Sequence, residues 1–519
     1  MQTVLERLDD LAGIDARDRT VAWLERIAFV FLVLMVVSAP HSIAATQTAW
    51  ITGMFVWLIR LFFKPRVKFR FGPLDMALWA FFAWSVVTSL TSYAPDISLN
   101  KLRGVAVFLI FYFVAYNIRR RRAAHVLAFL LVASCMVNVV WMPVQRLIGR
   151  GVEIHGLAPD GPLAKALLHD GDALLEANGK KVYTPDDVAA AIEQADITKV
   201  KFYRPDFEFV VEVKRSDLLS GPGALEKLGV ASWKKSRNWR SSGFYGHYAT
   251  YSEVLQLIAS LVLGLFIASA SARFFPQSRK VAKESDDVSA SPRPPVALPL
   301  ALLFCLIAMS VALLLTVTRG SQLAFLISGA VIVLVGLGRK WLLAAAVIGI
   351  PLALIGLFVL QQSRQVGFFD TKDDSTKWRQ TVWREGLDLW TDSPRHFLLG
   401  VGMDSIKRYA NEWHLFDDGR LPTGHFHSTP LNLVVERGLP GLLLWLMVLG
   451  VYARTLWKGL RIPQSAVRSP HSAGILLGCL GGMIGFVASG FVHYNLGDQE
   501  VAMVFFLLMG LGLKSIESP

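Results

Sequence analysis

GHFHSTPLNLVVERGLPGLLLWLMVLG, residues 424–450, places two histidines directly before an apolar block, and blocks of this kind decide the fold. From Leu439 to Leu449 the stretch is almost wholly apolar. Crossing the hydrocarbon core of a bilayer takes about 20 predominantly apolar residues in a helix. The stretch therefore predicts a membrane-spanning helix whose mouth carries the imidazoles of His425 and His427.

Similar apolar blocks recur along the whole chain. Its 519 residues are 53% hydrophobic, which is more than soluble globular domains usually contain. Because the apolar residues come in long blocks, the sequence predicts an all-α polytopic membrane protein. We expect about twelve transmembrane helices, at 26–44, 46–63, 74–92, 103–118, 125–147, 250–270, 297–317, 321–338, 341–360, 430–452, 473–492 and 500–516.

Lysine and arginine in the connections predict the orientation, because cytoplasmic loops carry an excess of these residues. Connections such as 60–70 and 118–124 are basic, whereas the alternate short loops at 40–46 and 92–100 carry little charge. This pattern places both termini in the cytoplasm of a multi-pass protein of the bacterial inner membrane. The net charge of +13 fits this topology together with attraction to membrane lipids, and it does not indicate nucleic-acid binding.

Two large segments, 149–249 and 361–429, fall on the outer side, which is the periplasm in a bacterium with two membranes. The domain organisation that follows has three parts. N-terminal membrane helices occupy 1–148, a small periplasmic domain occupies 149–220, and C-terminal membrane helices with the large outer loop occupy 221–519.

The first outer segment has the pattern of a small α+β domain. Its elements are GPLAKALLHDGDALLEANGKKV (161–182), an expected helix TPDDVAAAIEQ (184–194), and two alternating strands, VKFYR (200–204) and EFVVEVKR (208–215). Thr184 is a favourable helix N-cap, and Asn178-Gly179 is a hairpin signal. Residues 151–215 resemble a bacterial PDZ domain inserted in an outer loop. The resemblance implies binding of an extended peptide or protein segment by strand addition.

The PDZ resemblance leaves other roles open. The loop that would hold a peptide carboxylate corresponds to VQRLIGRGV (144–152), which is here the exit of a membrane helix. A docking or spacer module is therefore the alternative to peptide binding. A PDZ domain beside membrane helices also fits an intramembrane protease, but the chain has neither an HExxH zinc motif nor a GxSxG nucleophile elbow.

Three motifs follow one another on the outer side. TRGSQLAF (318–325) puts Arg319 at the tip of a tight helix–helix connection. The next motif joins Arg379 and Trp383 in an R-x-x-x-W helix to a turn containing Pro394, Gly400 and Gly402. The last is the opening stretch, with His427, Leu431, Glu436, Gly438 and Gly441.

This order of motifs resembles the O-antigen ligase and polymerase family of lipid-linked glycan transferases, from about residue 240 to the C-terminus. Ser428 replaces the asparagine that usually follows the histidine, and the PDZ-like insertion is not part of the common family core. The resemblance implies transfer of a glycan from undecaprenyl pyrophosphate to an acceptor hydroxyl on the periplasmic face.

Three arginines are the predicted ligands of the pyrophosphate: Arg319, Arg240 and Arg379. Guanidinium groups stay charged and match phosphate geometry better than ammonium groups do. Simpler interpretations exist for two of them. Arg240 follows the basic run 234–237, and Arg379 could pair with Glu385 or Asp374 on a solvated helix face.

The histidines are the candidates for proton transfer, because the acceptor hydroxyl needs a base that titrates near neutral pH. His427, at the mouth of the span, is the predicted catalytic residue. His425 and His247 are predicted to bind substrate, and His493 is a further histidine on the same side. A lone histidine at a helix end is more often a cap than a catalyst, so this assignment depends on the whole set of motifs.

No cofactor or metal is expected, because no acidic pair of the DxD kind lies beside the histidines in the sequence. The first predicted reaction is O-antigen ligation to lipid A-core. A glycan polymerase for O-antigen or exopolysaccharide and a protein O-oligosaccharyltransferase share the same chemistry. A polysaccharide transporter or flippase is an alternative from a different class. Transporters need ionisable or broken-helix sites near the bilayer midplane, whereas the predicted spans carry almost no charge. A non-catalytic PDZ-bearing scaffold would leave the arginines and histidines without a role.

Overall fold

The computed structural model describes residues 4–15, 18–69, 71–204, 207–237, 239–274, 295–347, 349, 351, 374–461 and 469–516. The chain divides into two units, 1–138 with 242–519 (unit 1) and 139–241 (unit 2). Within the described residues, nine helices are long and apolar enough to cross a membrane, and the protein is therefore a multi-pass membrane protein. They are Arg19–Ser38, Pro73–Leu90, Pro95–Asn117, Arg121–Ile148, Tyr248–Arg273, Ala297–Leu315, Arg319–Leu337, Thr429–Arg461 and Pro470–Gly490.

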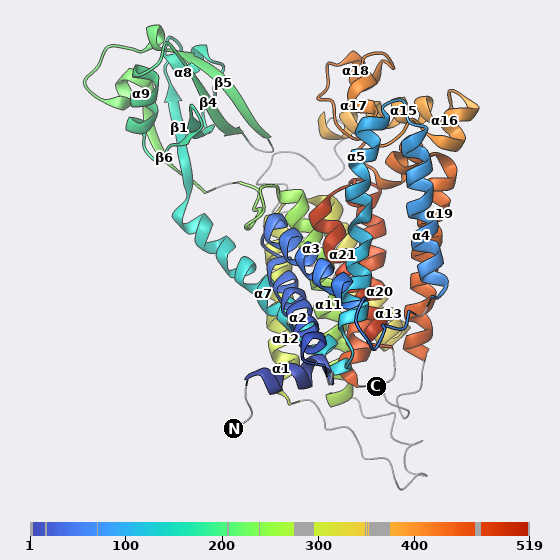
Figure 1. Ribbon diagram of the computed structural model, residues 1–519. Coiled ribbons are helices and arrows are strands. Elements are labelled where there is room, and N and C mark those ends of the chain that lie inside the picture. The colour runs from blue at the N-terminus through green and yellow to red at the C-terminus, as the bar shows by residue number, and fades with distance from the viewer. Residues whose placement is uncertain are drawn as a thin grey trace. The chain divides into compact units, whose positions relative to one another are not determined.

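The helices of unit 1 are shown in Figure 1. Their bounds are α1 Val4–Ala12, α2 Arg19–Ser38, α3 Ile43–Arg60, α4 Pro73–Leu90, α5 Pro95–Val105, η1 Ala106–Phe108, α6 Leu109–Asn117, α7 Arg121–Ile148 (continuing into unit 2), α11 Tyr248–Phe274, α12 Ala297–Leu315, α13 Arg319–Leu337, α15 Asp374–Thr391, α16 Pro394–Leu399, α17 Ile406–Tyr409, α18 Leu415–Asp418, α19 Thr429–Arg461, α20 Pro470–Gly490 and α21 Gln499–Lys514.

Three of the twelve predicted spans are not among these nine. Spans 46–63 and 500–516 fall on α3 and α21, which are helical but are not among the nine. Span 341–360 lies mostly outside the described residues. The count of twelve therefore stays a prediction.

The first span begins and ends earlier than predicted. The side chain of Asp18 accepts hydrogen bonds from the backbone N–H groups of Thr20 and Val21, so α2 begins at Arg19 rather than at residue 26. The helix ends at Ser38, and Pro40 lacks the N–H group that would continue its hydrogen-bond pattern. The predicted span 26–44 therefore included the turn between α2 and α3.

Glycines allow α11 and α20 to pack closely in the interior of unit 1. A Cβ atom added at Gly264 would lie 2.3 Å from the backbone nitrogen of Gly478 and 2.4 Å from the carbonyl oxygen of Gly474. Helices in membranes associate through such small residues, because close backbone approach maximises van der Waals contact. The two helices therefore form a rigid centre for the other spans.

Helix α19 is broken inside the predicted span. Gly438 has φ 66° and ψ 179°, a conformation that is essentially restricted to glycine, and Pro440 offers no N–H group. The carbonyls freed by the break accept hydrogen bonds from outside the helix. Val401 N–H donates to Val435 O (2.8 Å) and Gly402 N–H donates to Glu436 O (3.0 Å).

A third donor completes the repair of the break. The indole N–H of Trp84 on α4 donates to the carbonyl of Arg437 at 2.8 Å. Gly400 must be small, because a Cβ atom there would lie 2.6 Å from the backbone nitrogen of Arg437. The turn after α16 is therefore fitted into the gap of α19, and it holds the segment 374–429 against the membrane helices.

Helices α15 to α18 lie together at one end of the unit 1 helices, next to α5 and the start of α19 (Figure 1). We call this the site end. Its core is apolar and includes Val382, Phe416, Phe426 and Val435, each fully buried. Glu385, on α15, ties this helix to α18. Its carboxylate accepts the backbone N–H groups of Phe416 (2.6 Å) and Asp417 (3.0 Å).

Unit 2 contains an antiparallel sheet with strand order β5-β4-β2-β1-β6, and β3 pairs with β2. Apolar side chains from one face of the sheet and from its helices form the core, among them Val152, Leu174, Ile192 and Val200. The elements are β1 Arg150–Leu157, α8 Pro162–Lys165, β2 Ala173–Ala177, β3 Lys180–Lys181, α9 Pro185–Glu193, β4 Ile197–Arg204, β5 Phe207–Lys214, η2 Arg215–Asp217, α10 Ala224–Leu228 and β6 Val230–Ser236.

The local signals in this region correspond to the observed elements. Thr184 caps α9, and Asn178-Gly179, with φ 48° and 77°, forms the turn between β2 and β3. The sheet extends beyond the predicted limit at residue 220, because β6 pairs with β1. The PDZ resemblance itself stays a prediction.

Candidate functional site

Phe426 anchors the short segment that carries the two histidines. Its side chain is fully buried, and its ring stacks on Phe416 with centroids 6.0 Å apart. The indole N–H of Trp383 donates to the carbonyl of Phe426 at 2.8 Å. Because the middle residue is fixed on both its backbone and its ring, the flanking imidazoles of His425 and His427 are held half-buried at the site end.

The backbone of His427 is strained. It has φ 47°, a left-handed conformation that a residue other than glycine adopts only when its surroundings enforce it. Its N–H donates to Nδ1 of His425 at 3.2 Å, and the two rings lie 4.1 Å apart. That bond assigns the proton of neutral His425 to Nε2. The Trp378 ring meets His427 edge-on at 4.6 Å.

The surroundings of His427 oppose its protonation. Burial is the largest cause, and the charges of His425, Arg379, His493 and His247 add to it, so the pKa falls from 6.5 to about 2. A neutral imidazole is therefore the resting form. The expectation of a base that titrates near neutral pH is not met in this state of the site.

The pKa of His425 is lowered as well. Burial is again the largest cause, followed by the charge of Lys407, whereas the carboxylates of Asp404 and Asp498 act in the opposite direction. Cationic and imidazole groups thus dominate the surroundings of His427, whereas those of His425 contain both signs of charge. The groups around His427 favour an anion, because an anion would relieve the repulsion among them.

Arg319 begins α13, and its neighbour Gly320 contacts His493. A Cβ atom added at Gly320 would lie 3.0 Å from Nε2 of His493. The carbonyl of His493 accepts hydrogen bonds from the N–H and the hydroxyl of Thr429, both at 3.1 Å. The start of α13, the loop after α20 and the start of α19 therefore meet at one place.

The structure brings most of the predicted site residues together. His425, His247 and Arg379 all act on the pKa of His427, and the backbone of Arg319 adjoins Gly320, which contacts His493. Arg240 belongs to unit 2, where its backbone N–H donates to the Tyr203 hydroxyl at 3.3 Å.

A buried polar network lies behind the histidines, and sequence reasoning gave it no role. Glu436 and Arg437 are 2% and 4% exposed. The carboxylate of Glu436 accepts hydrogen bonds from the Tyr494 hydroxyl (3.1 Å) and the Asp404 backbone N–H (3.2 Å), and it lies 3.6 Å from Nη1 of Arg437. The Tyr494 ring contacts His425 with centroids 5.5 Å apart.

Two features of the sequence could have indicated this network. Tyr494 is next to His493, and Arg437 is next to the motif residue Glu436. The network also corrects the expectation that the spans carry almost no charge. Glu436 and Arg437 lie within α19, and Glu253, 4% exposed, lies within α11, 3.7 Å from Nδ1 of His493. All three lie near the helix ends that face the histidines, away from the centres of the spans.

Among the described residues, no group of three or more histidines, cysteines or carboxylates is placed to hold a metal ion. Cys135, Cys305 and Cys479 are free thiols in membrane helices. The chemistry available at the site end is therefore that of imidazoles, guanidinium groups and buried carboxylates.

Together, the fold and this cluster define a multi-pass helical membrane protein with a group of histidines and charged residues at one end of its spans. Residues 304–446 match the family model described as O-antigen ligase. The matched region contains Arg319, Arg379, His425 and His427. This match supports the resemblance found in the motifs.

A second comparison concerns a much shorter stretch. The chain is 34% identical over 77 residues to the magnetosome formation protease MamE of Magnetospirillum gryphiswaldense. The aligned stretch is 15% of this chain and 10% of that protein. The chain thus spans about a tenth of the length of this relative.

Proposed function

We propose that the chain is a glycosyltransferase that moves a glycan from undecaprenyl pyrophosphate to an acceptor hydroxyl, with ligation of O-antigen to lipid A-core as its reaction. The active site then faces the periplasm from the inner membrane, and both termini are cytoplasmic. One observation carries the proposal. Within the region that matches the O-antigen ligase model, His427 lies among cationic groups that favour an anionic ligand.

In this proposal, the pyrophosphate of the donor binds to the cationic groups around His427. Arg319 and Arg379 supply guanidinium groups, and His425 and His247 supply imidazoles. The lipid tail keeps the donor at the membrane surface, so cations at the ends of the spans meet its phosphates.

The transfer step forms one bond and breaks another. The acceptor oxygen bonds to the anomeric carbon of the glycan while the bond from that carbon to the phosphate oxygen breaks. The pyrophosphate leaves with the electron pair, and the acceptor hydroxyl gives its proton to the neutral imidazole of His427. Arginine side chains stabilise the charge that develops on the leaving group.

Because the pKa of His427 is about 2 in the empty site, its ability to accept a proton depends on the bound substrate. An imidazole with so low a pKa accepts a proton poorly while the site is empty. Binding of the negatively charged pyrophosphate raises the pKa of His427, because it neutralises the cations that opposed protonation. The base therefore becomes effective only when the donor is in place.

Deletion of the gene and analysis of the surface glycan separate the proposed reaction from its close alternatives. Loss of a ligase leaves bare lipid A-core together with accumulated lipid-linked polymer. Loss of a polymerase instead leaves core that carries a single repeat. An unchanged surface glycan would direct the search toward a protein acceptor.

Substitution of the base tests the assignment of His427. We expect His427→Ala to abolish transfer from purified lipid-linked donor while expression and membrane insertion stay normal, because no other group then receives the acceptor proton. His414→Ala is the matched control, since His414 lies in the same region, is 81% exposed and pairs with Asp418. Wild-type transfer by His427→Ala would remove His427 from the mechanism.

A further inference from the structure

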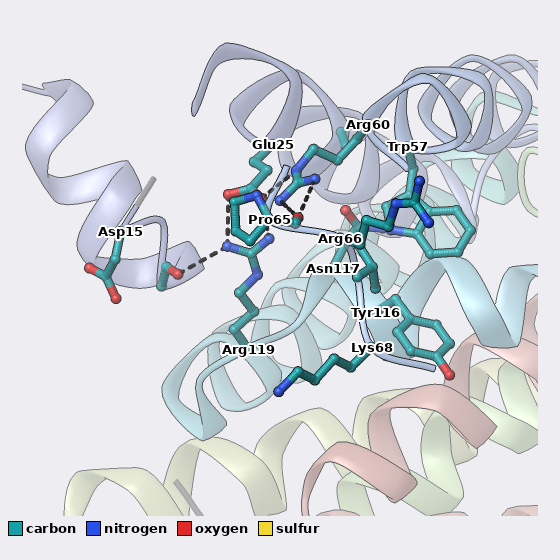
Figure 2. A pocket seen from close by; sticks show the side chains of 13 residues that line it. Asp15, Glu25, Trp57, Arg60, Pro65, Arg66, Lys68, Tyr116, Asn117 and Arg119 are labelled. Carbon is teal, nitrogen blue, oxygen red and sulfur yellow. Dashed lines mark hydrogen bonds and ion pairs between the residues drawn. The ribbon is translucent and has the colours of Figure 1, made fainter. Parts of the chain in front are cut away.

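A second polar site lies in unit 1 at the opposite end of α4 from the site end. It is a cavity of about 440 Å³ between α2, α3, α6 and the connection from α3 to α4 (Figure 2). At its other end, α4 leads into the turn where Tyr93 N–H donates to the carbonyl of Val401. With a rise of about 1.5 Å per residue, the 18 residues of α4 separate the two places by about 27 Å. The cavity is therefore not part of the histidine site.

Cations outnumber carboxylates in the wall of this cavity. Its charged lining residues are the carboxylates Asp15 and Glu25 and the cations Arg60, Arg66, Lys68 and Arg119. Glu25 is 6% exposed and lies between two of the cations, as Figure 2 shows. It accepts hydrogen bonds from Arg60 Nε at 2.8 Å and Arg119 Nη1 at 2.7 Å. Glu25 is thus fully paired, and the two arginines leave the inner wall with one net positive charge.

Arg60 also shapes the connection that closes the cavity. Its Nη1 donates to the carbonyls of Phe63 and Pro65, both at 3.0 Å, and its Nη2 donates to Pro65 at 3.0 Å. Further along, the Phe69 ring packs against Tyr116 and Trp57, with centroids 5.2 and 6.1 Å away. The backbone from residue 63 to 69 is therefore held at both ends.

Between these two anchors the chain presents Arg66 and Lys68, and both side chains are exposed. Neither makes a hydrogen bond or an ion pair with another residue that the structure describes. Arg66 and Lys68 thus add two cations, without a partner among the described residues, to a wall that is already positive, and this favours a ligand with a compact negative charge. A phosphate group fits this requirement, because it accepts several charge-assisted hydrogen bonds at once.

The surroundings of the cavity indicate the source of the phosphate. Phe62 and Phe71, which flank the basic residues, are 88% and 72% exposed, so an aromatic surface borders the charged one. Helix α1 has its own exposed apolar side chains and is fastened to α2 by the ion pair of Asp9 with Arg26 at 2.6 Å. Such interleaved basic and aromatic groups at a helix end are typical of the membrane–water interface.

We propose that this cavity binds the phosphate group of an anionic phospholipid through Arg66 and Lys68, while the acyl chains lie along the exposed apolar faces of the neighbouring helices. Basic pockets at the ends of membrane helices are a known way to hold such headgroups. The lipid would join the N-terminal helices to the connection that leads into α4.

Lipid binding to the full chain in a neutral detergent tests the proposal. Phosphatidylglycerol, phosphatidylcholine and inorganic phosphate are titrated separately, and binding is followed by the shift of the thermal unfolding temperature and by native mass spectrometry. We expect phosphatidylglycerol to bind more tightly than phosphatidylcholine. The double substitution Arg66→Ala with Lys68→Ala should weaken it by about 30-fold, which corresponds to about fivefold for each cation near an anionic headgroup.

The control removes the same charge elsewhere. Arg339 and Lys340 are also exposed and lie in a different basic connection, so Arg339→Ala with Lys340→Ala should change the affinity less than twofold. If both double variants lost the same affinity for phosphatidylglycerol, the binding would be general attraction to a basic surface, and the proposed site would be wrong. Stabilisation by inorganic phosphate without any by phosphatidylglycerol would overturn the lipid as its ligand. Neither result depends on glycan transfer, so the proposal fails or stands separately from the proposed function.

Discussion

At the scale of single residues, the pKa of His427 is determined by the groups around it rather than by the imidazole itself. Its imidazole has an ordinary pKa near 6.5 in an unfolded chain, but burial and the charges of its neighbours lower the pKa to about 2. The neighbours come from four separate stretches of the sequence, around residues 247, 379, 425 and 493. The same groups that weaken the base in the empty site would bind the donor pyrophosphate.

The lowered pKa predicts an unusual dependence of activity on pH. The pH dependence of kcat/KM reports the pKa values of the free enzyme. Because the pKa of His427 is about 2 there, its imidazole stays neutral as pH falls from about 8 to about 5, and kcat/KM should change less than threefold. A histidine with a pKa of 6.5 would lose about 30-fold over the same range. The acid limb of kcat should appear at higher pH than that of kcat/KM, since the bound pyrophosphate raises the pKa. An acid limb of kcat/KM near pH 6.5 would contradict the buried, cation-surrounded base.

Arg319 allows charge to be separated from geometry. It begins α13 directly beside the contact of Gly320 with His493, so its backbone position is fixed. A guanidinium can offer two parallel N–H donors to a phosphate, whereas an ammonium offers a point charge. We expect Arg319→Lys to lower the transfer rate by about 30- to 150-fold at matched protein level, as loss of a charged hydrogen bond of about 2–3 kcal/mol implies.

A conservative control accompanies that measurement. Arg420 lies in the same region of the chain, is 77% exposed and pairs weakly with Asp417 at 3.7 Å. Arg420→Lys should therefore leave the transfer rate unchanged. If Arg319→Lys were equally silent, Arg319 would be an interfacial charge, and the role of phosphate ligand would pass to Arg379.

Much of the candidate site could be predicted from the sequence, because its motifs are short and lie next to recognisable spans. His425 and His427 adjoin an apolar block, and Arg319 lies in a short connection between two such blocks. The network of Glu436 with Tyr494 could not be predicted in the same way. It joins residues 58 positions apart, and an average hydropathy conceals a single carboxylate inside an apolar helix.

At the scale of elements, the break in α19 is the feature on which the site end depends. Gly438 stops the helix, and the turn at Gly400 and Gly402 fills the gap. These glycines form a recognisable pattern in the sequence, but nothing in that pattern indicates that one group of glycines fits into the other. Their hydrogen bonds cross more than thirty residues, from Val401 to Val435 and from Gly402 to Glu436. Local signals predict turns, but they do not predict which carbonyl a turn will reach.

The break makes a sharp prediction for Gly438→Ala. A Cβ atom at this position would lie 2.1 Å from the carbonyl oxygen of Leu398, and the backbone conformation is one that alanine avoids. We expect the free energy of unfolding to fall by about 1–3 kcal/mol or more, and the glycan transfer rate to fall with it. Thermal unfolding in detergent measures the first effect, and the donor assay measures the second.

The same helix supplies the control, because a Cβ atom added at Gly450 meets nothing within 4 Å. Gly450→Ala should leave the unfolding temperature unchanged or raise it slightly, since alanine favours the helix by about 1 kcal/mol over glycine. Equal behaviour of the two variants would mean that the break at residue 438 is not required for the folded state.

At the scale of the whole molecule, the chain consists of a helical membrane unit and a sheet-containing unit inserted between two of its helices. The multi-pass class was predictable because long apolar blocks can be recognised in the sequence without knowing which residues are in contact. The full extent of unit 2 was not, because β6 is joined to β1 only by strand pairing across about 80 residues. The match of residues 304–446 to O-antigen ligase lies wholly within unit 1.

We therefore expect the sheet-containing unit to be dispensable for the transfer step. Because β6 belongs to the sheet, the excision should run from residue 150 to 237, replaced by a short Gly/Ser linker that keeps Arg240. Purified donor should still be used by the shortened protein. Complete loss of transfer by a normally inserted variant would assign unit 2 a part in catalysis. A reporter fused near residue 180 should lie outside the cytoplasm, and a cytoplasmic signal there would reverse the proposed topology.

The break in α19 also bears on how the chain is made. A membrane offers no water to the carbonyls of Val435, Glu436 and Arg437, so each must find a donor within the protein. The three donors, on Trp84, Val401 and Gly402, all precede α19 in the chain. Synthesis from the N-terminus thus delivers every donor before the first acceptor emerges. The broken helix can enter the bilayer with its partners already made, an order that a circular permutation placing α19 ahead of α4 would destroy.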